Sequence, residues 1–188
     1  MRIEGIWTAL ITPFEGDRVD VAALRRLVER QIDEGVHGLL ACGTTGETPT
    51  LADDEYDRVV ATTIEAAAGR VPVMAGTGAN DTAKTVAWTR RARELGADAA
   101  LVVTPYYNKP QQEGMFLHFA EVAEAGGLPV MLYNVPGRTG ITLAPATTAR
   151  LATVPGIVAV KEASGSIAAV RDIVATTPPA FSVLSGDD

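Results

Sequence analysis

The chain has 188 residues, of which 47% are hydrophobic and 21% charged, so it can bury a hydrophobic core and does not have the composition of a disordered chain. Its formal net charge of −7 argues against an electrostatic surface for nucleic acid or anionic lipid. One cysteine and two histidines exclude an intrachain disulfide and a structural His/Cys zinc site.

Short apolar or β-branched runs recur along the chain, spaced by roughly the 30 residues of one strand and its crossover helix. In chain order, these predicted strands are Trp7–Ile11, Gly38–Ala41, Val71–Ala75, Ala99–Val103, Pro129–Tyr133, Ile157–Val160 and Phe181–Leu184.

Helical patterns with start and stop signals fill the intervals between these runs. In order, they run from the cap Asp20 to Gly35, from Thr50 to Gly69, over 81–95 and over 113–125, with shorter ones after Thr142 and Ser166. Thr50 followed by Asp53 resembles a capping box at the start of the second helix. Strict alternation of strand and helix predicts a parallel sheet that is buried on both faces.

Two architectures fit this order of elements: a doubly wound open sheet and a (β/α)₈ barrel. Periodicity does not choose between them, but no G-x-G-x-x-G follows the first strand, so the dinucleotide-binding form of the open sheet lacks its main signature. We find no linker or low-complexity segment, and we predict a single domain over residues 1–188. No run approaches the roughly 18 apolar residues of a membrane span, and the N-terminus lacks a signal peptide, so we expect a cytoplasmic protein.

The residues best suited to chemistry follow the predicted strands directly. In a parallel α/β protein these positions are the C-terminal ends of the strands, where active sites form. Six such loops on one rim favour an enzyme over a scaffold. The six segments are Gly43–Glu47, Gly76–Asn80, Thr104–Asn108, Asn134–Gly140, Lys161–Gly165 and Ser185–Asp188.

Lys161 is the strongest candidate for a reactive group. It is one of only three lysines among 16 cationic residues, and it directly follows an apolar strand. Desolvation at the mouth of a barrel would lower the pKa of its amine and leave a neutral nucleophile that can attack a ketone. The alternative is a lysine that reaches into solvent, which position alone favours.

Other residues on this rim allow a functional and a structural interpretation. The glycines and threonines of Gly43–Glu47 could hold a carboxylate, or they could form an ordinary turn. Tyr133 and Tyr107 could relay protons, although a buried tyrosine is more often a core residue. Arg138 could clamp a carboxylate or lie in solvent. Cys42 has no suitably placed histidine, and we interpret it as a packing residue.

These motifs, in order along the whole chain, resemble the dihydrodipicolinate synthase and N-acetylneuraminate lyase superfamily. The Arg138-Thr139-Gly140 segment resembles the synthase branch of that superfamily. The motifs are Gly43-Thr44-Thr45-Gly46-Glu47, Pro105-Tyr106-Tyr107-Asn108, Tyr133-Asn134-Val135-Pro136, Arg138-Thr139-Gly140, Val160-Lys161-Glu162-Ala163 and Leu184-Ser185-Gly186-Asp187-Asp188.

The resemblance implies a (β/α)₈ TIM barrel and an aldolase-type synthase of the lyase class that works without an organic cofactor. Its reaction would condense pyruvate with aspartate 4-semialdehyde to 4-hydroxy-tetrahydrodipicolinate, in lysine and diaminopimelate biosynthesis. A homotetramer built as a dimer of dimers is implied as well.

The resemblance also assigns roles by position. Lys161 would form the Schiff base with pyruvate, and Thr45 with its loop amides would hold the pyruvate carboxylate. Tyr133 would relay protons, linked through Thr44 to Tyr107 from the neighbouring subunit. Arg138 would bind the semialdehyde carboxylate, and Gly186 would offer its main chain near the substrate.

Two alternatives stay open at this point. A related pyruvate-dependent aldolase, acting on a 2-keto-3-deoxy sugar acid or on sialic acid, would use the same lysine, and Arg138 counts against it. A degenerate ligand-binding paralogue would lack catalysis, and the intact set of Lys161, Tyr133, Thr44, Thr45 and Tyr107 counts against that.

Two further expectations concern length and regulation. A complete (β/α)₈ barrel needs about 250 residues, so we expect a barrel truncated after about seven strands, without its last βα unit and C-terminal helical extension. The isolated 188-residue chain should then be nearly inactive. Lys84 lies where lysine-sensitive members of the superfamily tend to carry glutamate, so we expect weak feedback inhibition by lysine.

Overall fold

The computed structural model describes residues 2–186, so the predicted rim residues Asp187 and Asp188 lie outside the described part of the chain. The described chain divides into two compact units. The N-terminal unit contains residues 4–76 and 91–100, and the C-terminal unit contains residues 2–3, 77–90 and 101–186. The single-domain organisation expected for residues 1–188 stays a prediction.

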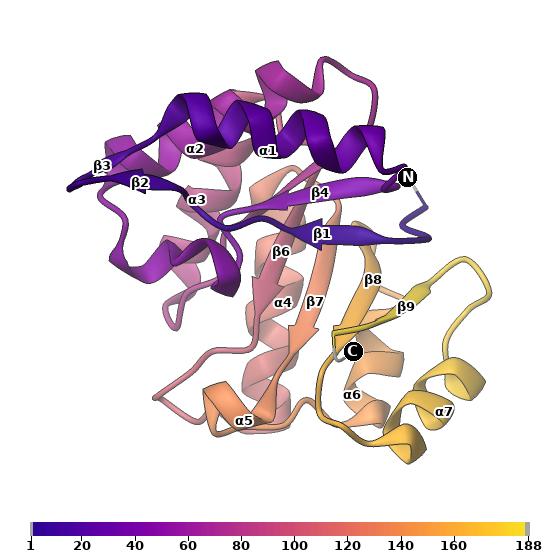
Figure 1. The fold of residues 1–188 in the computed structure, drawn as a ribbon. Coiled ribbons are helices and arrows are strands. Elements are labelled where there is room, and N and C mark those ends of the chain that lie inside the picture. The colour runs from indigo at the N-terminus through magenta and orange to yellow at the C-terminus, as the bar shows by residue number, and fades with distance from the viewer. Residues whose placement is uncertain (1, 187–188) are drawn as a thin grey trace. The chain divides into compact units, whose positions relative to one another are not determined.

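The N-terminal unit is built on short parallel strands covered by two helices. Strand β4 (Gly38–Ala41) pairs in parallel with β1 (Trp7–Ala9) on one side and with β5 (Val73–Gly76) on the other. Helices α1 (Val21–Asp33) and α2 (Asp53–Ala67) pack against each other (Figure 1). The smaller elements are the antiparallel pair β2 (Phe14–Glu15) and β3 (Arg18–Val19) and the 3₁₀ turns η1 (Thr44–Gly46) and η2 (Thr48–Thr50).

The helix caps of this unit confirm one prediction and correct another. Asp20 caps α1 as expected, because its carboxylate accepts a hydrogen bond from the Ala23 amide at 2.8 Å. The capping box predicted at Thr50 and Asp53 is wrong. Thr50 belongs to η2, and α2 begins after Ala52, whose amide donates to the Glu55 carboxylate at 2.9 Å.

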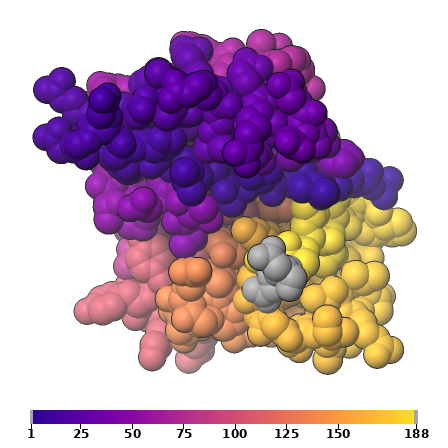
Figure 2. Space-filling view, viewed as in Figure 1, coloured from indigo at the N-terminus to yellow at the C-terminus, as the bar shows by residue number. Residues whose placement is uncertain are grey.

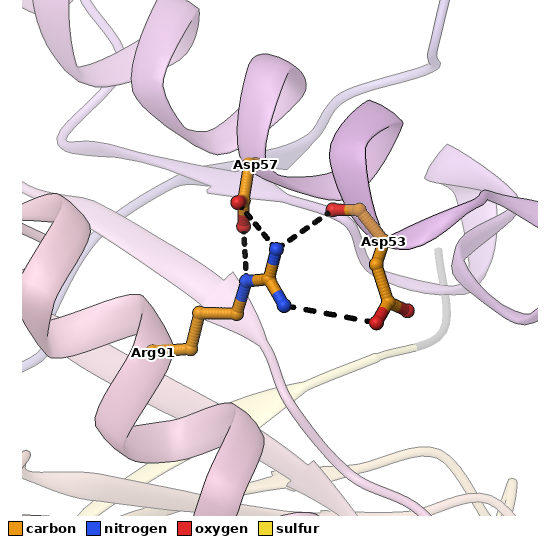
Figure 3. Close-up of polar contacts among 3 residues, drawn as sticks. All are labelled: Asp53, Asp57 and Arg91. Carbon is orange, nitrogen blue, oxygen red and sulfur yellow. Dashed lines mark hydrogen bonds and ion pairs between the residues drawn. The ribbon is translucent and has the colours of Figure 1, made fainter.

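An arginine joins the second half of α3 (Thr82–Leu95) to α2 within the N-terminal unit. The Arg91 guanidinium donates through Nε and Nη2 to both carboxylate oxygens of Asp57, and Nη2 also donates to the Asp53 carbonyl at 3.3 Å. A longer ion pair of 3.7 Å reaches the Asp53 carboxylate (Figure 3). Arg91 therefore ties α3 to both Asp53 and Asp57, which lie one turn apart at the start of α2.

The C-terminal unit carries the longer strands. Strand β8 (Ile157–Glu162) pairs in parallel with β7 (Val130–Asn134) and with β9 (Ser182–Ser185). All five residues of β7 are buried. Helices α6 (Pro145–Leu151) and α7 (Ile167–Thr176) pack against each other, and Ser166 caps the start of α7, because its hydroxyl accepts from the Ala169 amide at 3.2 Å (Figure 1). The remaining bounds are β6 (Ala99–Val103), α4 (Gln112–Gly126) and α5 (Pro136–Thr139).

The strand order decides between the two architectures that the sequence allowed. The hydrogen-bonded order is β1-β4-β5-β6-β7-β8-β9, which follows the order of these strands along the chain. A doubly wound sheet reverses its order at a switch point, whereas a (β/α)₈ barrel adds each strand beside the previous one. The seven strands thus have the order of a (β/α)₈ barrel, as predicted.

Helix α7 carries two exposed apolar residues, and the end of the chain to which it belongs is yellow and orange in Figure 2. Ile167 and Val174 lie two turns apart and are 74% and 59% exposed. Within residues 2–186, no helix combines the length and the apolar character that crossing a membrane requires.

Candidate active site

Lys161 and Tyr133 lie side by side at the ends of two paired strands. Tyr133 of β7 is in register with Lys161 of β8, so the two side chains leave the same face of the sheet. The Lys161 Nζ lies 4.7 Å from the centre of the Tyr133 ring. Lys161 is part of β8, which continues to Glu162, rather than the first residue after the strand as predicted. Regular strand backbone therefore directs the lysine side chain.

Gly186 lies against the aliphatic stem of Lys161. A Cβ atom at this position would come within 2.8 Å of the Lys161 Cε and within 2.8 Å of the Ala163 Cβ. The Gly186 amide donates to the Glu162 carbonyl at 2.8 Å, which holds the chain at this short range. The close approach thus requires glycine. The structure places Gly186 and Tyr133 beside Lys161, and the roles predicted for the three residues stay predictions.

Two buried polar side chains lie one residue beyond the lysine and the tyrosine, and sequence analysis assigned them no role. Asn134 and Glu162 are in register and are 1% and 3% exposed. The Asn134 amide Nδ2 lies 3.0 and 2.9 Å from the two carboxylate oxygens of Glu162. The Ser164 amide donates to Glu162 Oε1 at 2.9 Å, and the Leu143 amide donates to Asn134 Oδ1 at 2.9 Å.

Arg138 lies on the short helix α5, directly after β7. Its side chain is exposed, whereas the next residue, Thr139, is buried. The Thr139 hydroxyl accepts from the Thr104 hydroxyl at 3.3 Å and lies 3.0 Å from the Ile141 carbonyl oxygen. The loop is therefore anchored from inside through Thr139, and it presents the Arg138 guanidinium to solvent.

Tyr107 lies in an exposed loop after β6. It follows β6 in the left-handed backbone region, with φ of 70°, and it is 86% exposed. The next residue, Asn108, is fixed because its side-chain amide donates to the Asn80 carbonyl at 2.9 Å. Tyr107 thus projects from an anchored loop, and its predicted link to Tyr133 through Thr44 stays a prediction.

In the N-terminal unit, the turn after β4 presents Thr44 and Thr45. Both are exposed, whereas Gly43 and Gly46 are buried. The Thr12 hydroxyl donates to the Gly46 carbonyl at 2.7 Å. Because this hydrogen bond anchors the turn, its two exposed threonines have a fixed place, which suits the binding of an anion.

Cys42 begins this turn in an unusual backbone conformation. Its φ is 53°, which is strained for a residue other than glycine. The Thr48 hydroxyl hydrogen-bonds the Cys42 carbonyl, and a Cβ at Gly76 would come within 1.9 Å of that carbonyl oxygen. Burial raises the pKa of the Cys42 thiol to about 12, so the thiol stays protonated and is a packing residue.

The pair of Lys161 and Tyr133 defines what the site can do chemically. A primary amine can add to a ketone and form an imine, and a neighbouring phenol can supply and remove protons at the reacting carbon. Among residues 2–186, no three His, Cys, Asp or Glu side chains cluster closely enough to hold a metal ion.

Fold and site together define a (β/α)-barrel protein with an amine and a phenol at the C-terminal ends of neighbouring strands. The model of the dihydrodipicolinate synthetase family matches residues 2–188. The chain belongs to this family.

Several relatives are highly similar. The chain is 54% identical to the 4-hydroxy-tetrahydrodipicolinate synthase of Thermomicrobium roseum over 186 residues, which are 99% of this chain and 62% of the relative. It is also 54% identical to the enzyme of that name from Methylococcus capsulatus, covering 99% of this chain and 64% of the relative. The chain thus spans less than two thirds of the length of these relatives.

A solved structure of similar fold is the chloride-inhibited dihydrodipicolinate synthase of Acinetobacter baumannii, complexed with pyruvate. Its TM-score to this chain is 0.96 at 46% sequence identity, and the match covers 98% of this chain and 64% of the other.

Proposed function

We propose that the protein is a 4-hydroxy-tetrahydrodipicolinate synthase, which condenses pyruvate with aspartate 4-semialdehyde through a lysine Schiff base. The observation that carries the proposal is the placement of the Lys161 amine 4.7 Å from the Tyr133 ring on one face of two paired strands. Family membership supports it, and so does the pyruvate bound to the similar Acinetobacter baumannii enzyme.

The residues take the following roles in this proposal. Lys161 attacks the ketone of pyruvate and, after loss of water, holds it as an imine and then as an enamine. The Tyr133 hydroxyl moves protons at the reacting carbon. Thr45 and its loop amides bind the pyruvate carboxylate, and Thr44 and Tyr107 continue the proton relay from Tyr133.

Arg138 sets the specificity for the second substrate. Its guanidinium is exposed beside a loop anchored by Thr139, where it can bind the carboxylate of aspartate 4-semialdehyde with two parallel hydrogen bonds. The main chain of Gly186 borders the lysine stem. No organic cofactor is needed, because the imine itself withdraws electrons from the pyruvate carbon.

The proposal includes the setting in which the enzyme acts. It serves lysine and diaminopimelate biosynthesis in the cytoplasm as a homotetramer, a dimer of dimers. The 86% exposure of Tyr107 supports an assembled state, because a neighbouring subunit would cover its ring and receive its hydroxyl. Light scattering on the purified protein measures the mass of the assembly and so tests whether it is a tetramer.

Borohydride trapping tests the function, and it is carried out on this chain as part of a closed (β/α)₈ barrel, because the isolated 188 residues are expected to be nearly inactive. Reduction in the presence of pyruvate should add a stable adduct to the peptide that contains Lys161, and Lys161→Arg should abolish it, because arginine cannot form an imine. Lys84→Arg is the matched control, because Lys84 is exposed on α3, and this variant should keep the adduct. An adduct on Lys84 or Lys109 in place of Lys161 would refute the assignment.

A second measurement tests the aldehyde. Aspartate 4-semialdehyde should be consumed with pyruvate, and Arg138→Leu should raise the KM for the semialdehyde far more than the KM for pyruvate. Equal or faster turnover of a sugar-acid aldehyde would favour the related aldolase, and an imine without any turnover would favour the non-catalytic paralogue.

A further inference from the structure

We propose that Asn134 and Glu162 form a positioning pair that holds Lys161 and Tyr133 in the geometry needed for imine formation. This inference rests on the proposed function, because it takes Lys161 as the reacting amine. Neither Asn134 nor Glu162 touches the substrate in this proposal. They act through their neighbours in the two strands.

The pair lies on the face of the sheet opposite the reacting groups. Successive side chains of a strand point to opposite faces, so Asn134 and Glu162 project away from the side that carries Tyr133 and Lys161. Both strands end at this pair, with Asn134 and Glu162 as their last residues. A side-chain bridge here therefore locks the strands directly behind the reacting amine.

The chemistry of the bridge makes it specific to one register. A carboxylate that is 3% exposed must have its oxygens hydrogen-bonded, because burying an unsatisfied charge costs several kcal/mol by general estimates. Asn134 Nδ2 lies within 3.0 Å of both oxygens, and the Ser164 amide adds a third contact at 2.9 Å. A slip of either strand would break both contacts between Asn134 and Glu162 at once, whereas the Ser164 contact lies within the lysine strand's own segment. A pair of apolar side chains would tolerate such a slip.

The same pair fixes the start of the loop that carries Arg138. The Leu143 amide donates to Asn134 Oδ1 at 2.9 Å. This hydrogen bond holds together the two ends of the loop that contains Arg138. The backbone ladder continues past the pair, because the Ala163 amide donates to the Asn134 carbonyl at 2.8 Å. Asn134 thus uses its amide nitrogen to place the lysine strand and its amide oxygen to place the arginine loop.

A reciprocal exchange of the two groups provides the test. Asn134→Asp would place two carboxylates face to face, and Glu162→Gln would place an amide nitrogen where an acceptor is needed. The double variant restores one amide opposite one carboxylate with reversed polarity, and the carboxylate that replaces the Asn134 amide can still accept from the Leu143 amide. Each single variant should slow borohydride-trapped imine formation about 10–100-fold, because a displacement of about 1 Å costs on that order. The double variant should recover to within roughly threefold of the original protein.

The readout separates positioning from a general loss of stability. Rates are normalised to the folded fraction from circular dichroism of the same sample, and kcat and KM for pyruvate are measured separately. Positioning predicts a lower kcat with a nearly unchanged KM. Thr147→Val is the matched control, because it removes the 2.7 Å hydrogen bond to Gln112 from a buried site elsewhere in the unit. It should lower stability without changing the normalised rate.

The outcomes distinguish this proposal from the proposed function. Absence of a Lys161 adduct in the unsubstituted protein would overturn the function itself. With that adduct present, unchanged normalised rates in both single variants would overturn the positioning role. The same conclusion would follow if the double variant were folded but no faster than the single variants. Slow single variants and a fast double variant would establish the pair.

Discussion

Replacing Gly186 with alanine should displace the Lys161 amine and, under the proposed function, slow its reaction with pyruvate while leaving most of the fold intact. The added Cβ would come within 2.8 Å of the Lys161 Cε, whereas ordinary contact begins at 3.4 Å, so one group must move by at least about 0.6 Å. The Lys161 stem is flexible, and it gives way more easily than the Ala163 Cβ on the strand end. The movement therefore falls mainly on the amine.

The size of the effect follows from that displacement. Misplacement of a reacting group by about 1 Å costs about 10²-fold in rate, so imine formation should slow about 10–100-fold. Overpacking against Ala163 should cost about 1–3 kcal/mol of stability. Gly137→Ala is the control, because within the described chain a Cβ at Gly137 meets no atom within 4 Å.

The assay follows the borohydride-trapped adduct on the Lys161 peptide over time by mass spectrometry, alongside urea denaturation. Gly137→Ala should match the unsubstituted protein in both measurements. If Gly186→Ala formed the imine at the full rate, the close packing of Gly186 against the lysine would have no functional consequence, and the reasoning would fail.

Three further predictions follow from individual side chains. Tyr133→Phe keeps the ring beside Lys161 but removes the hydroxyl, so turnover should fall about 10²–10⁴-fold with little change in thermal unfolding; undiminished turnover would make Tyr133 a packing residue. Because burial raises the pKa of Cys42 to about 12, its thiol should resist iodoacetamide near pH 8 until the protein is unfolded, and rapid labelling of the folded protein would contradict this. Burial lowers the pKa of His118 from 6.5 to about 4, so between these values the unfolded chain binds a proton that the folded chain does not. This group should leave the free energy of unfolding unchanged above pH 6.5 and lower it by up to about 3 kcal/mol as the pH falls to 4. His118→Asn should remove that part of the decline in urea denaturation, and an identical decline in both proteins would count against it.

Much of the fold could be predicted because apolar runs mark the strands of this chain, and capping or stop residues mark the ends of its helices. Strands β4 and β6 have the predicted bounds, since glycine or polar residues flank each apolar run. Ser166 and Asp20 cap their helices as expected, because a short side-chain oxygen is the usual signal for a helix start. The hairpin of β2 and β3 was missed, because strands of two residues carry no periodicity.

The positions of the candidate groups Lys161 and Tyr133 could be predicted from the sequence, and the side chains that support them could not. Lys161 and Tyr133 stand out because they are chemically distinctive residues at the ends of apolar runs. Asn134 and Glu162 look like the first polar residues of loops, and their pairing appears only when the strands are set side by side. The helix that carries Arg138 was missed as well, because four residues beginning at a proline are indistinguishable from a turn.

The face that Lys161 shares with Tyr133 depends on one irregularity that no apolar pattern reveals. Val130 pairs with Ile157, but the next residue, Met131, pairs with Ala159, so Val158 is an extra residue in β8. Without this shift, Lys161 would lie opposite Asn134, and Tyr133 would lie opposite Val160. A one-residue slip transfers a side chain to the opposite face of a sheet. The amine would then leave from the face that now carries the Asn134 and Glu162 pair. The bulge at Val158 therefore brings the lysine to the tyrosine, and the hydrogen bonds between Asn134 and Glu162 stabilise the register that it creates.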